Sequence, residues 1–169
     1  MFWGDFLKEK KYNRDEAVNY AKTWAYKRNS KYYNFDNIGG DCTSFVSQCL
    51  YAGCKTMNYK EHIGWYYNSI KDRAPAWSGV EYLYNFLIKN KDVGPSAIIS
   101  DRNSVEKGDI IQLKFSNMNQ FSHSLFIVDK TNENIFVATH TDDTFYRTLS
   151  SYVYENIRFL HINKVLTWS

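Results

Sequence analysis

A short run of residues, GGDCTSF at positions 39–45, has the composition of a cysteine nucleophile site. Two glycines allow a sharp turn and a close approach of the backbone to a substrate. Asp41 is a residue type that caps helices, so Cys42 is expected in the first turn of one. There the helix dipole and the free amides favour a thiolate, and Gly40 and Asp41 lie in the loop that would contact oxyanion and substrate. The same pattern also fits a buried apolar cysteine, and the residues alone leave both interpretations open.

A thiol nucleophile needs a base, and four histidines are available. His123 begins the alternating segment HSLFIV, so we expect it at the start of a strand that can face a helix N-terminus. His140 ends the next such segment. If the two segments form a hairpin, both histidines lie at one end of the sheet and one can orient the other. His62 lies in an irregular polar segment and is expected at the surface, whereas His161 alternates with apolar residues and is expected to be a hydrogen-bonded sheet residue.

The other two cysteines are expected to have no chemical role. Cys49 lies seven residues after Cys42 on the same apolar stripe, which favours core packing, and Cys54 follows the predicted end of that helix. The C-x6-C-x4-C spacing lacks the short cysteine pair of a zinc site, so no metal is expected. Three cysteines are an odd number and do not make a disulfide framework.

Helices in the first half of the chain and strands in the second must position these residues. Capping residues and apolar stripes predict helices over 13–30, 41–53 and 78–90. Asn13, Asp41 and Ser78 are the expected N-caps, and Gly53 is the expected residue after the second helix. Alternation with period two predicts strands over 97–100, 109–115, 123–129, 134–140 and 156–165. The chain is therefore expected to be α+β, with N-terminal helices packed on one side of an antiparallel sheet.

Composition narrows the function classes. The chain has 169 residues without an internal repeat or a Pro/Gly-rich linker, which predicts a single domain over 1–169 and, as expected here, a monomer. A net charge of +3 argues against a nucleic-acid partner. No segment has the length and apolarity of an integral membrane segment. The first 16 residues lack the apolar core of a secretory signal, so none is expected in this chain.

The sequence resembles the bacterial "putative amidase domain" family, a branch of the papain-like clan that also contains CHAP and NlpC-type cell-wall hydrolases. The resemblance covers residues 12–150. It rests on GGDCTSFVSQ at 39–48, on KGDIIQ at 107–112, and on HS at 123–124 followed by HTD at 140–142. It implies a papain-like (NlpC/CHAP-like) fold with the nucleophile at a helix N-terminus.

The resemblance also implies roles for individual residues. Cys42 would be the nucleophile, His123 the general base and then the general acid, and His140 the third catalytic residue that orients His123. Asp142 is the alternative third residue, because it follows directly and carries a full charge. No metal or organic cofactor is implied.

The function implied by the resemblance is cysteine-dependent hydrolysis of amide bonds, in bacterial peptidoglycan or a peptide, through a thioester acyl-enzyme. Two alternatives remain: an acyl or peptidyl transferase that uses the same Cys-His site, and a non-catalytic wall-binding module. Such a function suggests a secreted, cell-wall-associated or phage-encoded protein.

Overall fold

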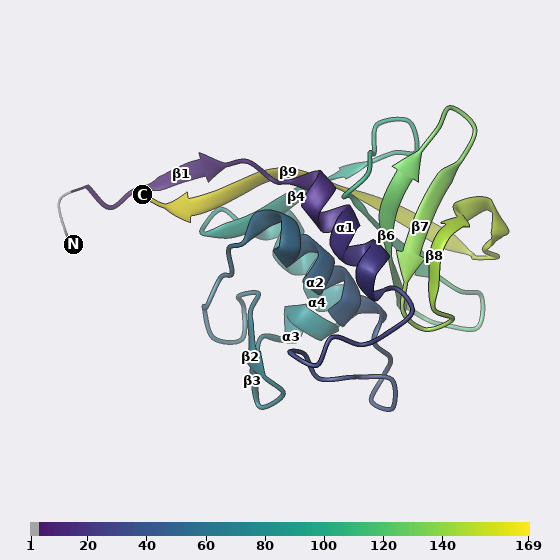
Figure 1. Ribbon diagram of the computed structural model, residues 1–169, viewed down its shortest axis with the longest axis horizontal. Helices are drawn as coiled ribbons and strands as arrows, with labels where there is room; N and C mark the ends of the chain where they lie inside the picture. The colour runs from purple at the N-terminus through teal and green to yellow at the C-terminus, as the bar shows by residue number, and fades with distance from the viewer. Residues whose placement is uncertain (1–3) are drawn as a thin grey trace.

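A computed structural model describes residues 4–169 and shows an α+β fold (Figure 1). Residues 1–3 lie outside the described residues. They belong to the predicted domain over 1–169 and to the 16-residue segment in which no secretory signal was expected. The helices are α1 (Arg14–Trp24), α2 (Cys42–Cys54), α3 (Pro75–Ser78) and α4 (Val80–Lys89). The strands are β1 (Leu7–Lys10), β2 (Tyr67–Ser69), β3 (Asp72–Arg73), β4 (Gly94–Ser100), β5 (Ile110–Lys114), β6 (His123–Lys130), β7 (Ile135–Thr139), β8 (Thr144–Thr148) and β9 (Asn156–Trp168).

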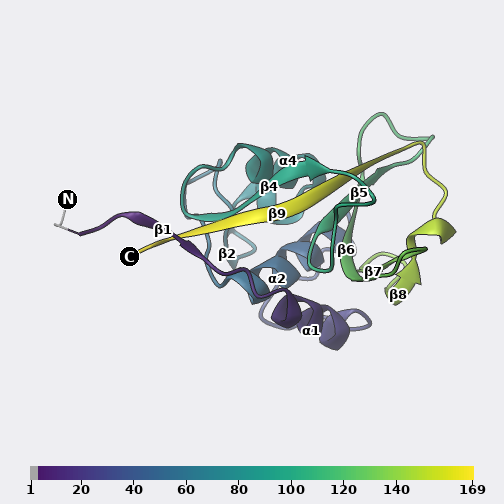
Figure 2. The same cartoon turned by 90° about the horizontal axis from the view of Figure 1, so that it is seen from above.

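The main sheet is antiparallel and runs in the order β1-β9-β5-β6-β7-β8, with β4 also paired to β9. β9 is the strand that connects the parts of this sheet. One of its edges pairs with β4, and the opposite edge pairs first with β5 and then with β1. Figure 2 shows β9 running along the length of the molecule. β6 and β7 form the predicted hairpin, which places the start of β6 beside the end of β7.

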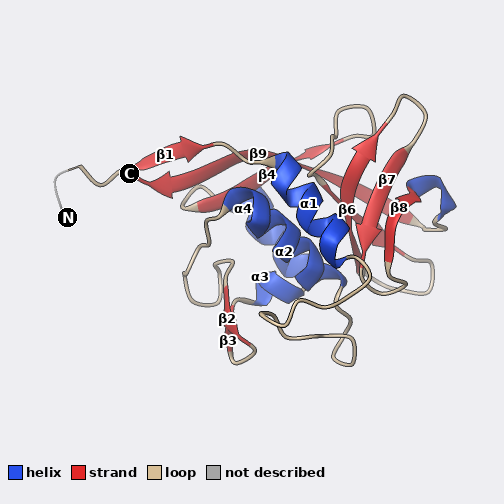
Figure 3. Ribbon diagram, in the orientation of Figure 1, coloured by secondary structure: helices blue, strands red, loops and turns tan. Residues whose placement is uncertain are grey.

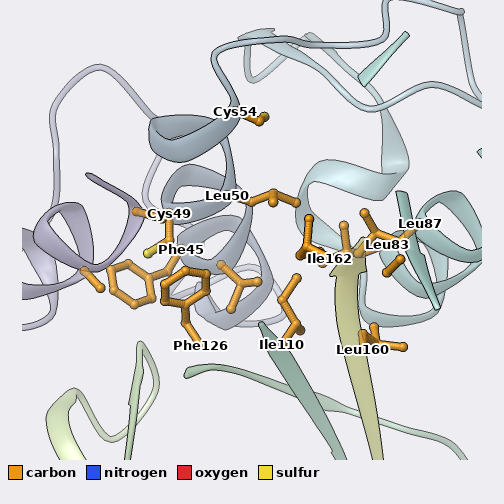
Figure 4. Close-up of a cluster of buried hydrophobic side chains, with 14 of the residues drawn as sticks. Phe45, Cys49, Leu50, Cys54, Leu83, Leu87, Ile110, Phe126, Leu160 and Ile162 are labelled. Carbon is orange, nitrogen blue, oxygen red and sulfur yellow. The ribbon is translucent and has the colours of Figure 1, made fainter. Parts of the chain in front are cut away.

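The helices cover one face of the sheet, as predicted (Figure 3). Along β6 the side chains alternate: Phe126 packs against the helices, and Leu125 and Ile127 pack in a second cluster on the other face. Figure 4 shows Phe45 and Leu50 of α2 directed toward the sheet. Burial of this apolar area, at about 25 cal/mol per Å², is the main force that holds α2 and its first turn on β6.

The first helix begins as predicted but ends early. The side chain of Asn13 accepts a hydrogen bond from the Glu16 amide at 3.1 Å, which confirms the N-cap. α1 then ends at Trp24 and not near residue 30, because the next amide bonds, such as that of Lys27 to the Trp24 carbonyl, form a tighter turn.

The ends of the next two helices differ from prediction. Gly53 lies inside α2, where a Cβ would come within 2.5 Å of the Tyr12 ring, so the glycine permits close packing against the segment before α1. Lys55, with a φ of 52°, is the left-handed residue that ends α2. Ser78 ends the short α3, and Gly79 is the N-cap of α4, so the predicted Ser78 cap is wrong.

The five predicted strands are present with small shifts at their ends, whereas β1, β2, β3 and β8 were not predicted. β1 and β8 are short and lie at the two ends of the main sheet, where no residue of either strand is fully buried and the apolar alternation is weak. Within residues 4–169 no helix is both long and apolar enough to cross a bilayer.

Candidate active site

Cys42 is the first residue of α2, as predicted, but Asp41 does not cap this helix with its side chain. The Asp41 carboxylate points away and accepts a hydrogen bond from the Phe35 amide at 2.9 Å. Within residues 4–169, the Asp41 side chain thus leaves the first amides of α2 without a cap. A helix N-terminus of this kind is suited to binding a developing oxyanion.

The second oxygen of Asp41 lies 2.5 Å from Nδ1 of His140, and both side chains are 1% exposed. Nε2 of His140 lies 2.8 Å from the carbonyl oxygen of Trp24, which only accepts hydrogen bonds. Nε2 therefore carries a hydrogen, and a proton must also lie between Nδ1 and the carboxylate. The His140 ring stacks on Phe45 with 4.1 Å between ring centroids. Asp41 and His140 thus form a buried hydrogen-bonded pair that ties the end of β7 to α1 and α2.

His123 is the first residue of β6 and is 7% exposed, and Cys42 is 6% exposed. The hydrogen-bond contact of its ring within residues 4–169 is between Nε2 and the Thr139 hydroxyl, at 3.5 Å. Burial lowers the pKa of His123 to about 4, while the charge of Asp142 raises it and that of Arg147 lowers it further. His123 is therefore a neutral imidazole at neutral pH and can accept a proton.

The predicted contact between His140 and His123 is wrong, although both histidines lie at the same end of the hairpin. The pairing of Phe126 with Ala138 sets the register, and its continuation places His140 opposite Ser124. Because neighbouring residues of a strand point to opposite faces, His140 faces the helices and His123 faces away from them. Both ring nitrogens of His140 are also already bonded.

Cys42 lies near β6, because the next residue, Thr43, is hydrogen-bonded to Ser124, the residue after His123. Burial raises the pKa of the Cys42 thiol, and hydrogen bonds from the Ser124 backbone and from Thr43 oppose this rise. The expected preference for a thiolate is thus not met in this conformation, because desolvation outweighs the helix N-terminus. Among the contacts of residues 4–169, no hydrogen bond joins Cys42 directly to His123.

Arg28 joins two loops, the one that precedes Cys42 and the one that follows His140. Its guanidinium donates to both carboxylate oxygens of Asp36, at 2.9 and 3.2 Å, and to both of Asp143, at 2.9 and 3.0 Å. Gly40 lies against Thr141, where a Cβ would be 3.3 Å from the hydroxyl oxygen. The loop before Cys42 and the β7–β8 turn are therefore fixed together. Arg28 was expected only as the end of a helix.

The remaining histidines and Cys49 lie where they were expected, whereas Cys54, expected after the end of the helix, is the last residue of α2. His62 is 83% exposed, and His161 bonds to the buried Asp109 carboxylate at 2.7 Å. Cys49 and Cys54 are fully buried. Burial raises the pKa of Cys49 well above its ordinary value and that of Cys54 to about 12.

Three buried polar residues beside Cys42 were not predicted to be part of the site: Thr43, Ser124 and Gln112, each with no exposed surface. Thr43 and Ser124 share a hydrogen bond of 2.9 Å between their hydroxyl oxygens, and Gln112 donates to Ser124 at 3.2 Å. The available signal was a polar residue on the helix-facing side of an otherwise apolar strand, as Ser124 is beside Phe126.

We predict that alkylation distinguishes the three thiols. Iodoacetamide at pH 8 should label Cys42 at least about tenfold faster than Cys49 or Cys54. Burial raises the pKa of Cys49 well above its ordinary value and that of Cys54 to about 12, so little of either thiol is in the reactive thiolate form. Peptide mass spectrometry over a time course measures the three rates, and urea-unfolded protein, in which all three should react alike, is the control. Equal rates in the folded protein would contradict the assignment of Cys42.

We predict that His123 makes the folded state sensitive to acid. Between pH 6.5 and about 4 the unfolded chain binds a proton at His123 that the folded chain does not bind, so stability falls as pH falls. Urea unfolding at pH 7.5 and 4.5 should show that the wild type loses about 2–3 kcal/mol more than His123→Gln. The same loss in both proteins would show that His123 is not buried in its neutral form.

Among residues 4–169, no group of three or more His, Cys, Asp and Glu side chains is arranged to hold a metal ion. The family described as "Putative amidase domain" matches residues 11–162. Two proteins of Bacillus subtilis (strain 168) are similar. "Uncharacterized protein YhbB" is 30% identical over 127 residues, which are 73% of this chain and 39% of the relative. "Uncharacterized protein YjcM" is 23% identical over 139 residues, which are 78% of this chain and 31% of the relative. The chain thus spans less than half the length of these relatives, and no solved structure matches it significantly.

Proposed function

Because this chain belongs to the "Putative amidase domain" family, we propose that it hydrolyses amide bonds with Cys42 as nucleophile and His123 as general base. The observation that carries the proposal is the position of Cys42 as the first residue of a helix that the Asp41 side chain does not cap, next to Thr43, which is hydrogen-bonded at 2.9 Å to Ser124, the residue that follows His123. A nucleophile, a neutral base and free amides for an oxyanion are the groups that acyl transfer requires.

The reaction begins with a protonated thiol and a neutral imidazole. In this mechanism His123 takes the proton of Cys42 as the sulphur attacks the amide carbonyl. Because His123 lies on the other face of β6 and its ring contacts Thr139, the mechanism requires the imidazole to turn around the start of the strand toward Cys42 when substrate binds. The oxyanion accepts hydrogen bonds from the Cys42 amide and from a second donor in the Gly40–Asp41 loop. His123 then protonates the leaving amine, and a thioester forms. Water, deprotonated by His123, releases the acid and restores the thiol.

We propose that groups other than His140 orient His123 and stabilise its protonated form. His140 is committed to Asp41 and to the Trp24 carbonyl, so we assign it as a positioning residue for the N-terminus of α2. The negative charge of Asp142 favours the protonated form of His123 and supports Asp142 as the residue that stabilises the imidazolium. Thr139, at 3.5 Å, can orient the ring.

The substrate that we propose is a peptide amide of bacterial peptidoglycan. The fold that we propose for the protein is papain-like. Support comes from the resemblance of the GGDCTSFVSQ and HTD runs to cell-wall hydrolases, and from a cysteine-bearing helix packed on an antiparallel sheet. Because Cys42 and His123 are more than nine-tenths buried, entry of the substrate requires movement of the loops that Arg28 holds.

Mass spectrometry of purified peptidoglycan fragments tests this function. Incubation with the protein should release a fragment with a new carboxylate and one with a new amine. A repeat with excess glycine amide distinguishes the transferase alternative, in which the acyl group appears on the added amine. Unchanged fragments that nevertheless bind to the protein would contradict hydrolysis and favour the wall-binding alternative.

A further inference from the structure

A chain of buried hydrogen bonds leads from a charged residue on β9 to the sulphur of Cys42. Arg158 donates to the side-chain oxygen of Gln112 at 2.6 and 2.8 Å. Gln112 donates to Ser124 at 3.2 Å, Ser124 lies 2.9 Å from Thr43, and the Thr43 hydroxyl lies 3.8 Å from the Cys42 sulphur. The chain therefore crosses β9, β5, β6 and α2.

Arg158 is firmly held at the outer end. Its guanidinium donates to Glu81 at 2.8 Å and lies between the rings of Tyr84 and Phe121, 3.7 and 4.0 Å from their centroids. A guanidinium is always charged and can only donate hydrogen bonds. Arg158 thus fixes which end of the Gln112 amide carries the oxygen.

The direction of every later bond follows from this first one. The nitrogen of Gln112 must face the carbonyl of Val80, at 3.1 Å, and the hydroxyl of Ser124. Within the described residues, the Ser124 hydroxyl has one other contact, Thr43, so its own hydrogen must point there or remain without an acceptor in a fully buried position. The Thr43 hydrogen is then free to point to the sulphur.

We propose that Arg158 orients this relay so that the Thr43 hydroxyl donates to the Cys42 sulphur and favours its anionic form. The relay rests on the proposed function only for its consequence in catalysis. Its residues are positioning residues, since none of them reaches the substrate. They supply to a buried thiol the stabilisation that the helix N-terminus alone does not supply.

Variants that break or reverse the relay test the proposal. Thr43→Val has the same shape but cannot donate. Gln112→Glu keeps the pairing with Arg158 but can only accept, so it should turn the Ser124 and Thr43 hydroxyls away from the sulphur. In each variant the pH midpoint for alkylation of Cys42 by iodoacetamide should rise by about one unit, which is about tenfold slower labelling below the midpoint. Thr43→Ser should restore the wild-type midpoint.

Gln48→Glu is the matched control. Gln48 is a buried glutamine of α2 that bonds to Tyr20 and Ser44 and has no contact with the relay. Gln48→Glu makes the same change of charge as Gln112→Glu but leaves the directions of the relay bonds unchanged. The pH midpoint for alkylation of Cys42 in Gln48→Glu should therefore remain that of the wild type. Equal shifts in Gln48→Glu and Gln112→Glu, or no shift in Thr43→Val, would overturn the relay.

Labelling needs no substrate, so the relay and the proposed function fail separately. Thermal unfolding of each variant confirms that the protein is folded, and Ser124→Ala on β6 provides a further break in the chain should Thr43→Val not fold. A shifted midpoint with no hydrolysis of any amide would keep the relay and remove the amidase. Normal hydrolysis with unshifted midpoints would do the reverse.

Discussion

Replacement of Cys42 by alanine is expected to reduce amide hydrolysis by at least about 10³-fold, because no other group at the site can form the thioester. The fold should persist. The change removes the sulphur and its contact with the Thr43 hydroxyl, so the loss of stability should be about 1 kcal/mol. The measurement is the initial rate of amine release from peptidoglycan fragments, beside a urea unfolding curve.

Cys49→Ala is the matched control for that prediction. Cys49 lies on the same helix and is fully buried, but it packs in the core and touches none of the reacting groups. Its alanine variant should lose stability and keep turnover. Full activity in Cys42→Ala would remove the mechanism, and an unfolded Cys42→Ala would revive the interpretation of a purely structural cysteine.

Replacement of Asp41 by alanine should cause the largest loss of stability, about 3–5 kcal/mol, because it leaves His140 buried and without its charged partner. It also leaves the Phe35 amide without its acceptor. Urea unfolding at neutral pH measures the loss.

Asp41→Asn separates the geometry of this pair from its charge. The amide can accept from Phe35 and donate to Nδ1 of a neutral His140, whose Nε2 still donates to the Trp24 carbonyl. The asparagine variant should therefore lose only about 1–2 kcal/mol. Equal losses in the two variants would contradict the shared proton, and no loss in either would show that the pair does not hold the N-terminus of α2.

Local sequence patterns predict the order of helices and strands, because each of these elements depends mainly on residues that are close in sequence. The alternation in HSLFIV predicts β6, and the Asn13–Glu16 pair predicts the start of α1. Helix ends were less predictable, since they depend on tertiary packing. Gly53 looks like a helix end in sequence, yet it stays helical because Tyr12 packs where its side chain would be.

The positions of Cys42 and His123 in the fold were predictable, and the contacts of the groups around them were less so. Cys42 and His123 lie on the predicted elements, and hairpin pairing brings His140 to the same end of the sheet. The partner of His140 was not predictable, because it depends on the pairing register and on the conformation of Asp41. In the sequence, an aspartate before a helix predicts an N-cap. In the folded chain the Asp41 carboxylate instead bonds to the buried His140.

Acid-quenched intact-protein mass spectrometry during turnover tests the assignment of Cys42 most directly. The protein is mixed with a peptidoglycan fragment, stopped in acid within seconds, and digested for peptide mapping. We predict an added mass equal to the acyl part of the substrate, carried on the peptide that contains Cys42 and removed by hydroxylamine. Hydrolysis accompanied by an acyl group on another residue would contradict the account.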